Sequence, residues 1–486
     1  MGEDTKTKID RNNDAKQTEK WSDKRIKTPL NACSLEVLQK GYSYNEKSDD
    51  GDDNDSVTHH PLIIGCYQLN ENSNDKTTVE EDKEAFSEEE DDDEISTEKE
   101  VQTSSSTRSG ALLLHMVEVP STTTSKHLKF GDPEQILNTS SGILDGKWFQ
   151  RAPIPFSTYD NNNINISSGY MYATACASGA IDIYRLLHKQ QQKCQLDLIA
   201  SSSPSFSHDH DNDHGLALSL AWDESVNVNH NDNEGTNSKM ATRIVSSYSK
   251  GSIAIHNVNL TNVENIDNNH DNNDVSFMEE THRWDAHKLF GCAAEVWTVC
   301  FASNQLYSTY ANTVISGGDD CKMKLWDLRT CSAVTNCSKP VHCIGDEEFS
   351  AGVTAVTYHP TLEHIFCSGS YDESIRLWDM RKLKSSEPVG RVAVGGGVWR
   401  IKWHPTKKGK ILIAAMHGGC RIIDVPCLLN LDYENHNCST SSYKMTIEKE
   451  FVEHKSMAYG ADWIHLDGEY EGSASCSFYD QQAFIW

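Results

Sequence analysis

The chain has 486 residues, of which 37% are apolar, and a formal net charge of -28 at pH 7. This acidic balance disfavours nucleic-acid binding through phosphate neutralisation and is compatible with attraction to a basic protein. The first residues contain no apolar signal core, and no apolar run approaches the roughly 20 residues that a membrane-spanning helix needs. We therefore expect a soluble, cytoplasmic protein with no nucleic-acid or membrane partner.

In chain order, residues 1–25 are predicted to be a disordered segment, and residues 26–486 a single domain of repeated units. The innermost strand of each unit is expected to begin with a small apolar residue and to carry an aromatic residue five positions later. Six such pairs occur: Ile143 with Trp148, Ala217 with Trp222, Val296 with Phe301, Val353 with Tyr358, Val398 with Trp403, and Ala458 with Trp463.

One more unit can be assembled upstream of these pairs, which gives seven units in all. Polar, acidic or Asn-rich stretches interrupt them, and we predict that these insertions are disordered and solvated. The predicted units cover approximately 33–119, 143–186, 214–256, 293–327, 351–379, 396–424 and 456–486, with insertions at about 71–109, 206–214 and 228–238.

Three units end in the same register: SGGDDCKMKLWDLR, SGSYDESIRLWDMR and SCSFYDQQAFIW. In each, an Asp precedes a Trp by six residues, as in a tight turn followed by an alternating strand, which is the pattern of a WD repeat. The predicted fold is therefore all-β, a seven-bladed WD40 β-propeller. Because the printed sequence stops at the end of a third strand, the outer strand of the last blade is expected from about residues 26–30, which removes an exposed sheet edge.

The usual enzyme signatures are missing, including GxSxG, Walker and HExxH motifs, and the cysteines lack zinc-ligand spacing. A site is therefore expected where hairpin turns meet the entrances of the innermost strands. Three entrances carry an aromatic residue at the same position, namely Trp297, Trp399 and Tyr459, and Glu295 lies beside them. This arrangement suits binding of a quaternary ammonium group, although simple packing of the aromatic rings explains it equally well.

The hairpin of the sixth blade, AAMHGGCRIID, places His417 where other blades carry Asp. A histidine there is a candidate general base, and Gly418 and Gly419 are candidate oxyanion donors. The alternative is that His417 fills the structural role of the Asp. Two further catalytic candidates are Asp319, which could orient a histidine, and His287, which could instead be the structural histidine of its blade.

The segments AHKLFGCAAEVWT, GGGVWRIKWHP, AAMHGG and YGADW, together with the first two WD segments, resemble one family. This family is the WD-repeat diphthine methylesterases of diphthamide biosynthesis, also described as diphthine methyltransferase homologues. The resemblance implies hydrolysis of the methyl ester of methylated diphthine on translation elongation factor 2, with no metal or organic cofactor. The insertions at 71–109 and 228–238 depart from the family pattern.

Two non-enzymatic interpretations remain open. Both complete WD repeats end in WDxR, which resembles the box of cullin-4 ubiquitin-ligase substrate receptors and would make the protein an adaptor that binds a ligase linker protein. A non-catalytic scaffold is the other alternative. In either case we expect a monomer.

Overall fold

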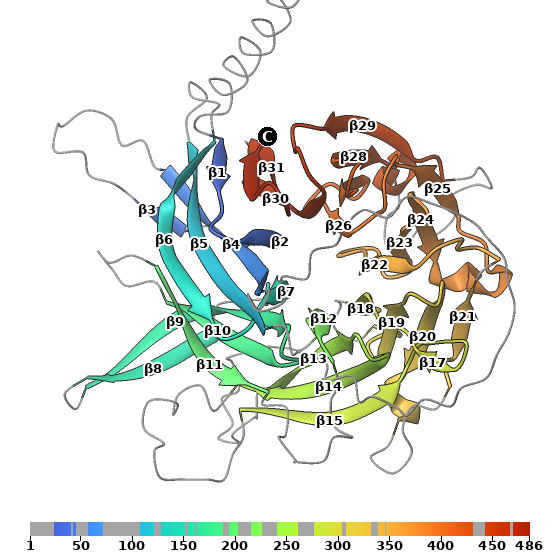
Figure 1. Cartoon of the computed structure of the whole chain (residues 1–486), viewed down its shortest axis with the longest axis horizontal. Coiled ribbons are helices and arrows are strands. Elements are labelled where there is room, and N and C mark those ends of the chain that lie inside the picture. Colours follow the sequence, from blue (N-terminus) through green and yellow to red (C-terminus); the bar gives the residue numbers. More distant parts are fainter. Residues whose placement is uncertain are drawn as a thin grey trace, which may run out of the picture.

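The computed structural model describes residues 24–39, 42–44, 57–70, 107–120, 128–150, 154–160, 163–187, 194–202, 215–225, 241–260, 277–303, 308–331, 339–345, 347–430, 443–466 and 470–486. Seven antiparallel sheets are arranged around a common axis (Figure 1). The predicted seven-bladed WD40 propeller is confirmed. The acidic insertion at 71–109 lies almost entirely outside the described residues, and the stretches at 206–214 and 228–238 lie wholly outside them.

The first three blades are long and include two additional strands, β3 and β8, each paired to the second strand of its blade. From the axis outward, their strands are β2 (Asn31–Val37), β4 (Val57–Asn70), β5 (Thr107–Pro120) and β6 (Lys129–Thr139), with β3 (Tyr42–Tyr44); β7 (Ile143–Trp148), β9 (Asn163–Cys176), β10 (Ile181–Leu187) and β11 (Gln195–Ser201), with β8 (Ile154–Asp160); and β12 (Ala217–Trp222), β13 (Ala241–Tyr248), β14 (Ser252–Asn259) and β15 (Met278–Asp285).

The remaining four blades are more regular. Their strands are β18 (Thr298–Phe301), β19 (Thr313–Gly317), β20 (Met323–Asp327) and β21 (His342–Ile344); β22 (Val353–Tyr358), β23 (Ile365–Ser370), β24 (Ser374–Asp379) and β25 (Gly390–Ala393); β26 (Arg400–Trp403), β27 (Lys410–Ala414), β28 (Cys420–Asp424) and β29 (Thr446–Phe451); and β30 (Ala458–Leu466), β31 (Tyr470–Ser477), β32 (Gln482–Ile485) and β1 (Arg25–Lys27).

The two ends of the described chain close the ring. Strand β1 pairs antiparallel with β32, with Arg25 opposite Phe484 and Lys27 opposite Gln482. The backbone N–H of Ile485 also donates to the carbonyl of Lys24 over 2.8 Å. The outer strand thus begins one residue before the range expected from the sequence and ends at Lys27. Its pairing leaves no exposed edge on the last blade.

Two of the aromatic residues five positions into the innermost strands, Trp222 and Trp463, join neighbouring blades by hydrogen bonds. The indole N–H of Trp222 donates to the carbonyl of Lys147 over 3.0 Å, and that of Trp463 donates to the carbonyl of Lys402 over 3.1 Å. In each pair the acceptor lies on the innermost strand of the preceding blade. A Trp suits this position because it buries a large apolar surface and still satisfies its donor. This explains why the pattern is visible in the sequence.

Within blade four, a buried polar network fixes the hairpin. His287 makes hydrogen bonds of 2.7 Å from Nδ1 to Asp320 and 2.8 Å from Nε2 to the Ser316 hydroxyl, which also accepts from the Trp326 indole over 2.9 Å. Asp320 pairs in addition with Lys324 over 2.9 Å. These contacts satisfy polar groups that are costly to bury alone.

No helix among the described residues is long and apolar enough to cross a membrane.

Candidate functional site

The aromatic residues predicted at the strand entrances meet at one end of the propeller axis. The rings of Trp297 and Trp399 have centroids 5.6 Å apart, and those of Trp399 and Tyr459 are stacked at 5.0 Å. All three side chains are partly exposed. They come from the entrances of blades four, six and seven, so closure of the ring turns an equivalent sequence position into a continuous aromatic surface.

Tyr371 completes this surface, although the sequence analysis did not identify it. Its ring is perpendicular to that of Trp297, at an interplanar angle of 87° and a centroid distance of 6.2 Å, and lies 6.1 Å from the ring of Trp399. The carboxylate of Asp319 accepts a 3.1 Å hydrogen bond from the Trp297 indole. We name Trp297, Tyr371, Trp399 and Asp319 the aromatic cage. Perpendicular rings beside a carboxylate suit an organic cation.

Two acidic residues, Asp319 and Glu295, lie at the cage. The backbone N–H of Asp319 donates to the carbonyl of Glu295 over 2.9 Å, which holds the two acidic residues together. Burial raises the pKa of the Tyr371 phenol, and the nearby Tyr459, Asp319 and Glu295 raise it further. Tyr371 therefore remains a neutral hydrogen-bond donor at physiological pH, and the carboxylates favour a positively charged ligand.

His417 lies on a hairpin turn beside the cage. The flanking pair Ala414 and Cys420 matches the pair Gly369 and Ile375 in blade five, so His417 occupies the position of Asp372. Its side chain is exposed, and no described residue forms a hydrogen bond with its ring. His417 thus does not take over the pairing of Asp372, which binds Arg376 over 2.6 Å. The role of His417 as a general base stays a prediction.

The two glycines after His417 do not fit the oxyanion role expected from the sequence. The N–H of Gly418 already donates to Ala415 over 2.7 Å, and that of Gly419 donates to Met416 over 3.0 Å. The turn adopts this form because Met416 has a φ of 42° and Gly419 a φ of 75°. Donors used inside a turn are not available to a ligand.

A closely packed glycine segment offers other donors. A Cβ at Gly396 would lie 2.1 Å from the Ala415 carbonyl and 2.6 Å from the Gly418 nitrogen, so only glycine allows this approach between the strand entrance and the His417 turn. Neither Gly396 nor Gly397 donates its N–H to another described residue. Gly396 lies against the turn, whereas Gly397 lies between the turn and Tyr371, since a Cβ at Gly397 would be 3.1 Å from the sulfur of Met416 and 3.2 Å from the Tyr371 ring.

The other two catalytic candidates have different surroundings. His287 is fully buried, and both its ring nitrogens are used in the blade-four network. Burial lowers its pKa, although Asp320 opposes that shift, so it is a neutral structural residue without access to a ligand. Asp319 contacts an indole rather than a histidine.

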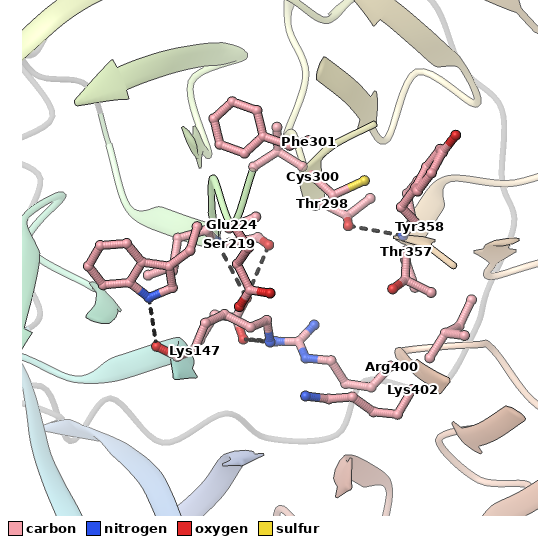
Figure 2. Close-up of a pocket in the computed structure, with 18 of the residues that line it drawn as sticks. Lys147, Ser219, Glu224, Thr298, Cys300, Phe301, Thr357, Tyr358, Arg400 and Lys402 are labelled. Atoms are coloured by element: carbon pink, nitrogen blue, oxygen red, sulfur yellow. Dashed lines mark hydrogen bonds and ion pairs between the residues drawn. The ribbon is translucent and has the colours of Figure 1, made fainter. Parts of the chain in front are cut away.

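The channel contains a cavity of about 190 Å³ that Arg400 and Lys402 line on one side and Lys147 on another (Figure 2). Trp399 of the cage also lines this cavity. Arg400 lies 5.6 Å from the Trp399 ring and 3.2 Å from the Asp145 carboxylate. Burial opposes ionisation of Asp145, but Arg400 and Lys147 outweigh it and lower the pKa of Asp145 to about 2.

Further ion pairs continue across the channel. Glu36 on β2 accepts from Lys147 over 2.7 Å and from Lys402 over 2.5 Å. Lys402 also lies 3.4 Å from Asp462. Such paired charges tie four innermost strands together, and removing one partner would leave a buried charge uncompensated.

Comparison with known proteins gives two independent results. The family model described as "WD domain, G-beta repeat" matches residues 279–327 and 338–379. The "Diphthine methyltransferase homolog" of Dictyostelium discoideum is 34% identical over 259 residues, which cover 51% of this chain and 60% of that protein. The resemblance to diphthine methyltransferases is confirmed.

Two mammalian relatives agree with this result. "Diphthine methyltransferase" of Mus musculus is 29% identical over a stretch that covers 67% of this chain and 54% of that protein. "Diphthine methyltransferase" of Homo sapiens is 31% identical over a stretch that covers 46% of this chain and 40% of that protein. The chain thus spans about half the length of the curated relatives it matches. A solved structure titled "Crystal Structure of Mitotic Checkpoint Complex" matches with a TM-score of 0.44 and 15% identity, over 78% of this chain and 86% of that one.

Proposed function

We propose that the protein is a carboxylic ester hydrolase that removes the methyl ester from methylated diphthine on translation elongation factor 2. The product, diphthine, would then be available for amidation to diphthamide. The observation that carries the proposal is the aromatic cage, because methylated diphthine bears a trimethylammonium group next to its ester. The names of the relatives support the same pathway. The substrate would place the reaction in the cytoplasm.

In this proposal the cage binds the cation and positions the ester. The faces of Trp297 and Tyr371 contact the methyl groups, and the carboxylates of Asp319 and Glu295 compensate the positive charge. Such interactions are worth about 0.5–2 kcal/mol for each ring. A cation held at this point leaves the adjacent ester next to the His417 turn. Only Gly397 lies between that turn and the Tyr371 ring, because a Cβ at Gly397 would be 3.1 Å from the Met416 sulfur and 3.2 Å from the ring.

His417 acts as the general base in the proposed reaction. Its imidazole takes a proton from water as the water oxygen attacks the ester carbonyl carbon, and the negative charge moves to the carbonyl oxygen. The N–H groups of Gly396 and Gly397 stabilise that oxygen. When the tetrahedral intermediate collapses, the carbon–methoxy bond breaks and the imidazolium gives its proton to the departing methoxide, so that methanol and a carboxylic acid are released. The acid then loses its proton to water and becomes the carboxylate. The scheme uses no metal or organic cofactor.

The experiment follows the intact mass of elongation factor 2 bearing methylated diphthine, incubated with the purified protein with and without S-adenosylmethionine. The proposal predicts loss of one methylene mass and release of methanol without S-adenosylmethionine. A methyltransferase, as the relatives are named, would instead add mass only when S-adenosylmethionine is present. No mass change in either condition, with the two proteins still bound, would favour the adaptor or scaffold interpretation.

The adaptor alternative receives no specific support from the WDxR motifs. Arg329 pairs with Asp327 of its own motif over 2.7 Å, and Arg381 pairs with Asp379 over the same distance. Each Asp also caps the short 3-10 helix that follows it, η3 (Leu328–Thr330) or η4 (Met380–Ser385). The cap formed by the Asp, and its ion pair with the Arg, account for the WDxR sequence without a ligase partner.

A further inference from the structure

A small hairpin projects from the connection between blades three and four. Its strands are β16 (Lys288–Leu289) and β17 (Cys292–Ala293), and only Phe290 and Gly291 lie between them. Phe290 is 98% exposed and Leu289 is 40% exposed. We name residues Leu289–Phe290 the apolar finger. Phe290 is the most exposed large apolar side chain among the described residues.

The backbone at the tip is unfavourable for phenylalanine. Phe290 has a φ of 51° and Gly291 a φ of 87°, so both central residues of the two-residue turn are in the left-handed region. Primed hairpin turns require this geometry and favour Asn-Gly or Asp-Gly. A bulky residue there costs about 1–2 kcal/mol. Folding alone therefore explains neither the conformation nor the exposure of Phe290.

The base of the hairpin is firmly held. The N–H of Ala294 donates to the carbonyl of His287 over 3.2 Å, and the N–H of His287 donates to the carbonyl of Gly251 over 3.0 Å. The ring of His287 is anchored in the buried network of blade four. A side chain presented from a fixed base loses little conformational entropy when it binds a partner.

A short stretch of chain joins the finger to the cage. The chain runs from the hairpin through Ala294 and Glu295 into Trp297, the first ring of the cage. Trp297 follows Phe290 by seven positions, so their Cα atoms are at most about 25 Å apart. A standard protein interface of about 800 Å² per partner is roughly 30 Å across. One bound protein can therefore contact both the cage and the finger.

We propose that the apolar finger is an anchor for the folded protein that presents the methylated side chain to the cage, with Phe290 inserted into an apolar pocket of that protein. This rests on the proposed function, because it takes the cage as the site that receives the modified residue. Glu295, which lies between finger and cage in the chain, and Asp319 of the cage indicate that the pocket is flanked by basic residues. Single buried aromatic anchors commonly carry much of the binding energy of such interfaces.

The test uses Phe290→Asn, which removes the aromatic ring and introduces the residue that this turn prefers. Thermal stability should be unchanged or higher. Affinity for elongation factor 2 bearing methylated diphthine, measured by calorimetry, should fall at least tenfold. Binding of a free trimethylammonium compound to the cage should be unchanged. The matched control is Leu198→Asn, since Leu198 is 55% exposed on the outer strand β11, and this variant should keep wild-type affinity.

The binding measurement separates this inference from the proposed function. If the wild-type protein binds the elongation factor and Phe290→Asn binds it more weakly, the anchor is supported even where no ester is hydrolysed. If both proteins hydrolyse the ester and bind equally, the anchor is overturned and the esterase stands. Absence of wild-type binding also overturns the anchor. So does sedimentation showing that Phe290 instead mediates self-association of this chain.

Discussion

Replacement of Trp297 by alanine tests the cation specificity of the aromatic cage. The substitution removes one ring 5.6 Å from Trp399 and 6.2 Å from Tyr371, together with the indole donor to Asp319. A partly desolvated cation–π contact is worth about 1–2 kcal/mol, which corresponds to roughly 5- to 30-fold in affinity. We expect KM to rise by that factor with little change in kcat, because the contact is made equally in the ground state and the transition state.

The assay compares two ligands that differ only in charge. A trimethylammonium compound and its neutral tert-butyl counterpart are titrated by calorimetry into the wild-type protein, Trp297→Ala and Trp297→Phe. The wild-type protein should prefer the cation, Trp297→Ala should lose most of this preference, and Trp297→Phe should lose less because it keeps a ring. Equal binding of both ligands to the wild-type protein would refute the reasoning, since the cluster would then be ordinary apolar packing.

Three further predictions concern catalysis and stability. His417→Asn should lower kcat about 10²- to 10⁴-fold without changing the melting temperature, and unchanged kcat would remove His417 as the base. Burial lowers the pKa values of His256 and His359 to about 4, so the unfolded chain binds more protons below pH 6.5. Denaturant titrations should therefore show stability falling between pH 7 and pH 5 by about 2 kcal/mol for each histidine, and a flat profile would contradict this. Deletion of residues 1–28 should expose the edge of β32, lower the melting temperature and promote association, whereas a stable monomer would show that β1 is dispensable.

The sequence was sufficient to predict most of the fold, because strong local patterns repeat. The Trp at the end of the third strand donates to a Ser of the neighbouring strand, and the aromatic residue five positions into the first strand is buried between blades, so both recur at fixed spacing. The bounds of the closing strand were less certain, since Arg25–Lys27 is short and lacks such a pattern. Its place follows only from its pairing with β32.

The site was predicted in part. Trp297, Trp399 and Tyr459 were found because they share a position in the repeat. Tyr371 was overlooked, although it occupies the same position before a hairpin Asp as Asp319 does, and comparison of those positions would have found it. The N–H groups of Gly418 and Gly419 form hydrogen bonds inside their own turn because Met416 has a positive φ. The sequence does not reveal this backbone conformation.

The ion pairs of the channel could not have been predicted. Glu36 and Lys402 are separated by 366 residues in the chain, and only closure of the ring brings their strands together. No local pattern distinguishes them from surface charges, which are far more common. Likewise, the sequence KLFG does not indicate that its phenylalanine is fully exposed.

The most direct measurement of the central claim is ester hydrolysis in ¹⁸O-labelled water. Elongation factor 2 bearing methylated diphthine is incubated with the protein in the absence of S-adenosylmethionine, and the modified peptide is analysed by mass spectrometry. We predict release of unlabelled methanol and one ¹⁸O atom in the new carboxylate, with both lost in His417→Asn. An unchanged methyl ester, or a methyl group gained only when S-adenosylmethionine is added, would contradict the account.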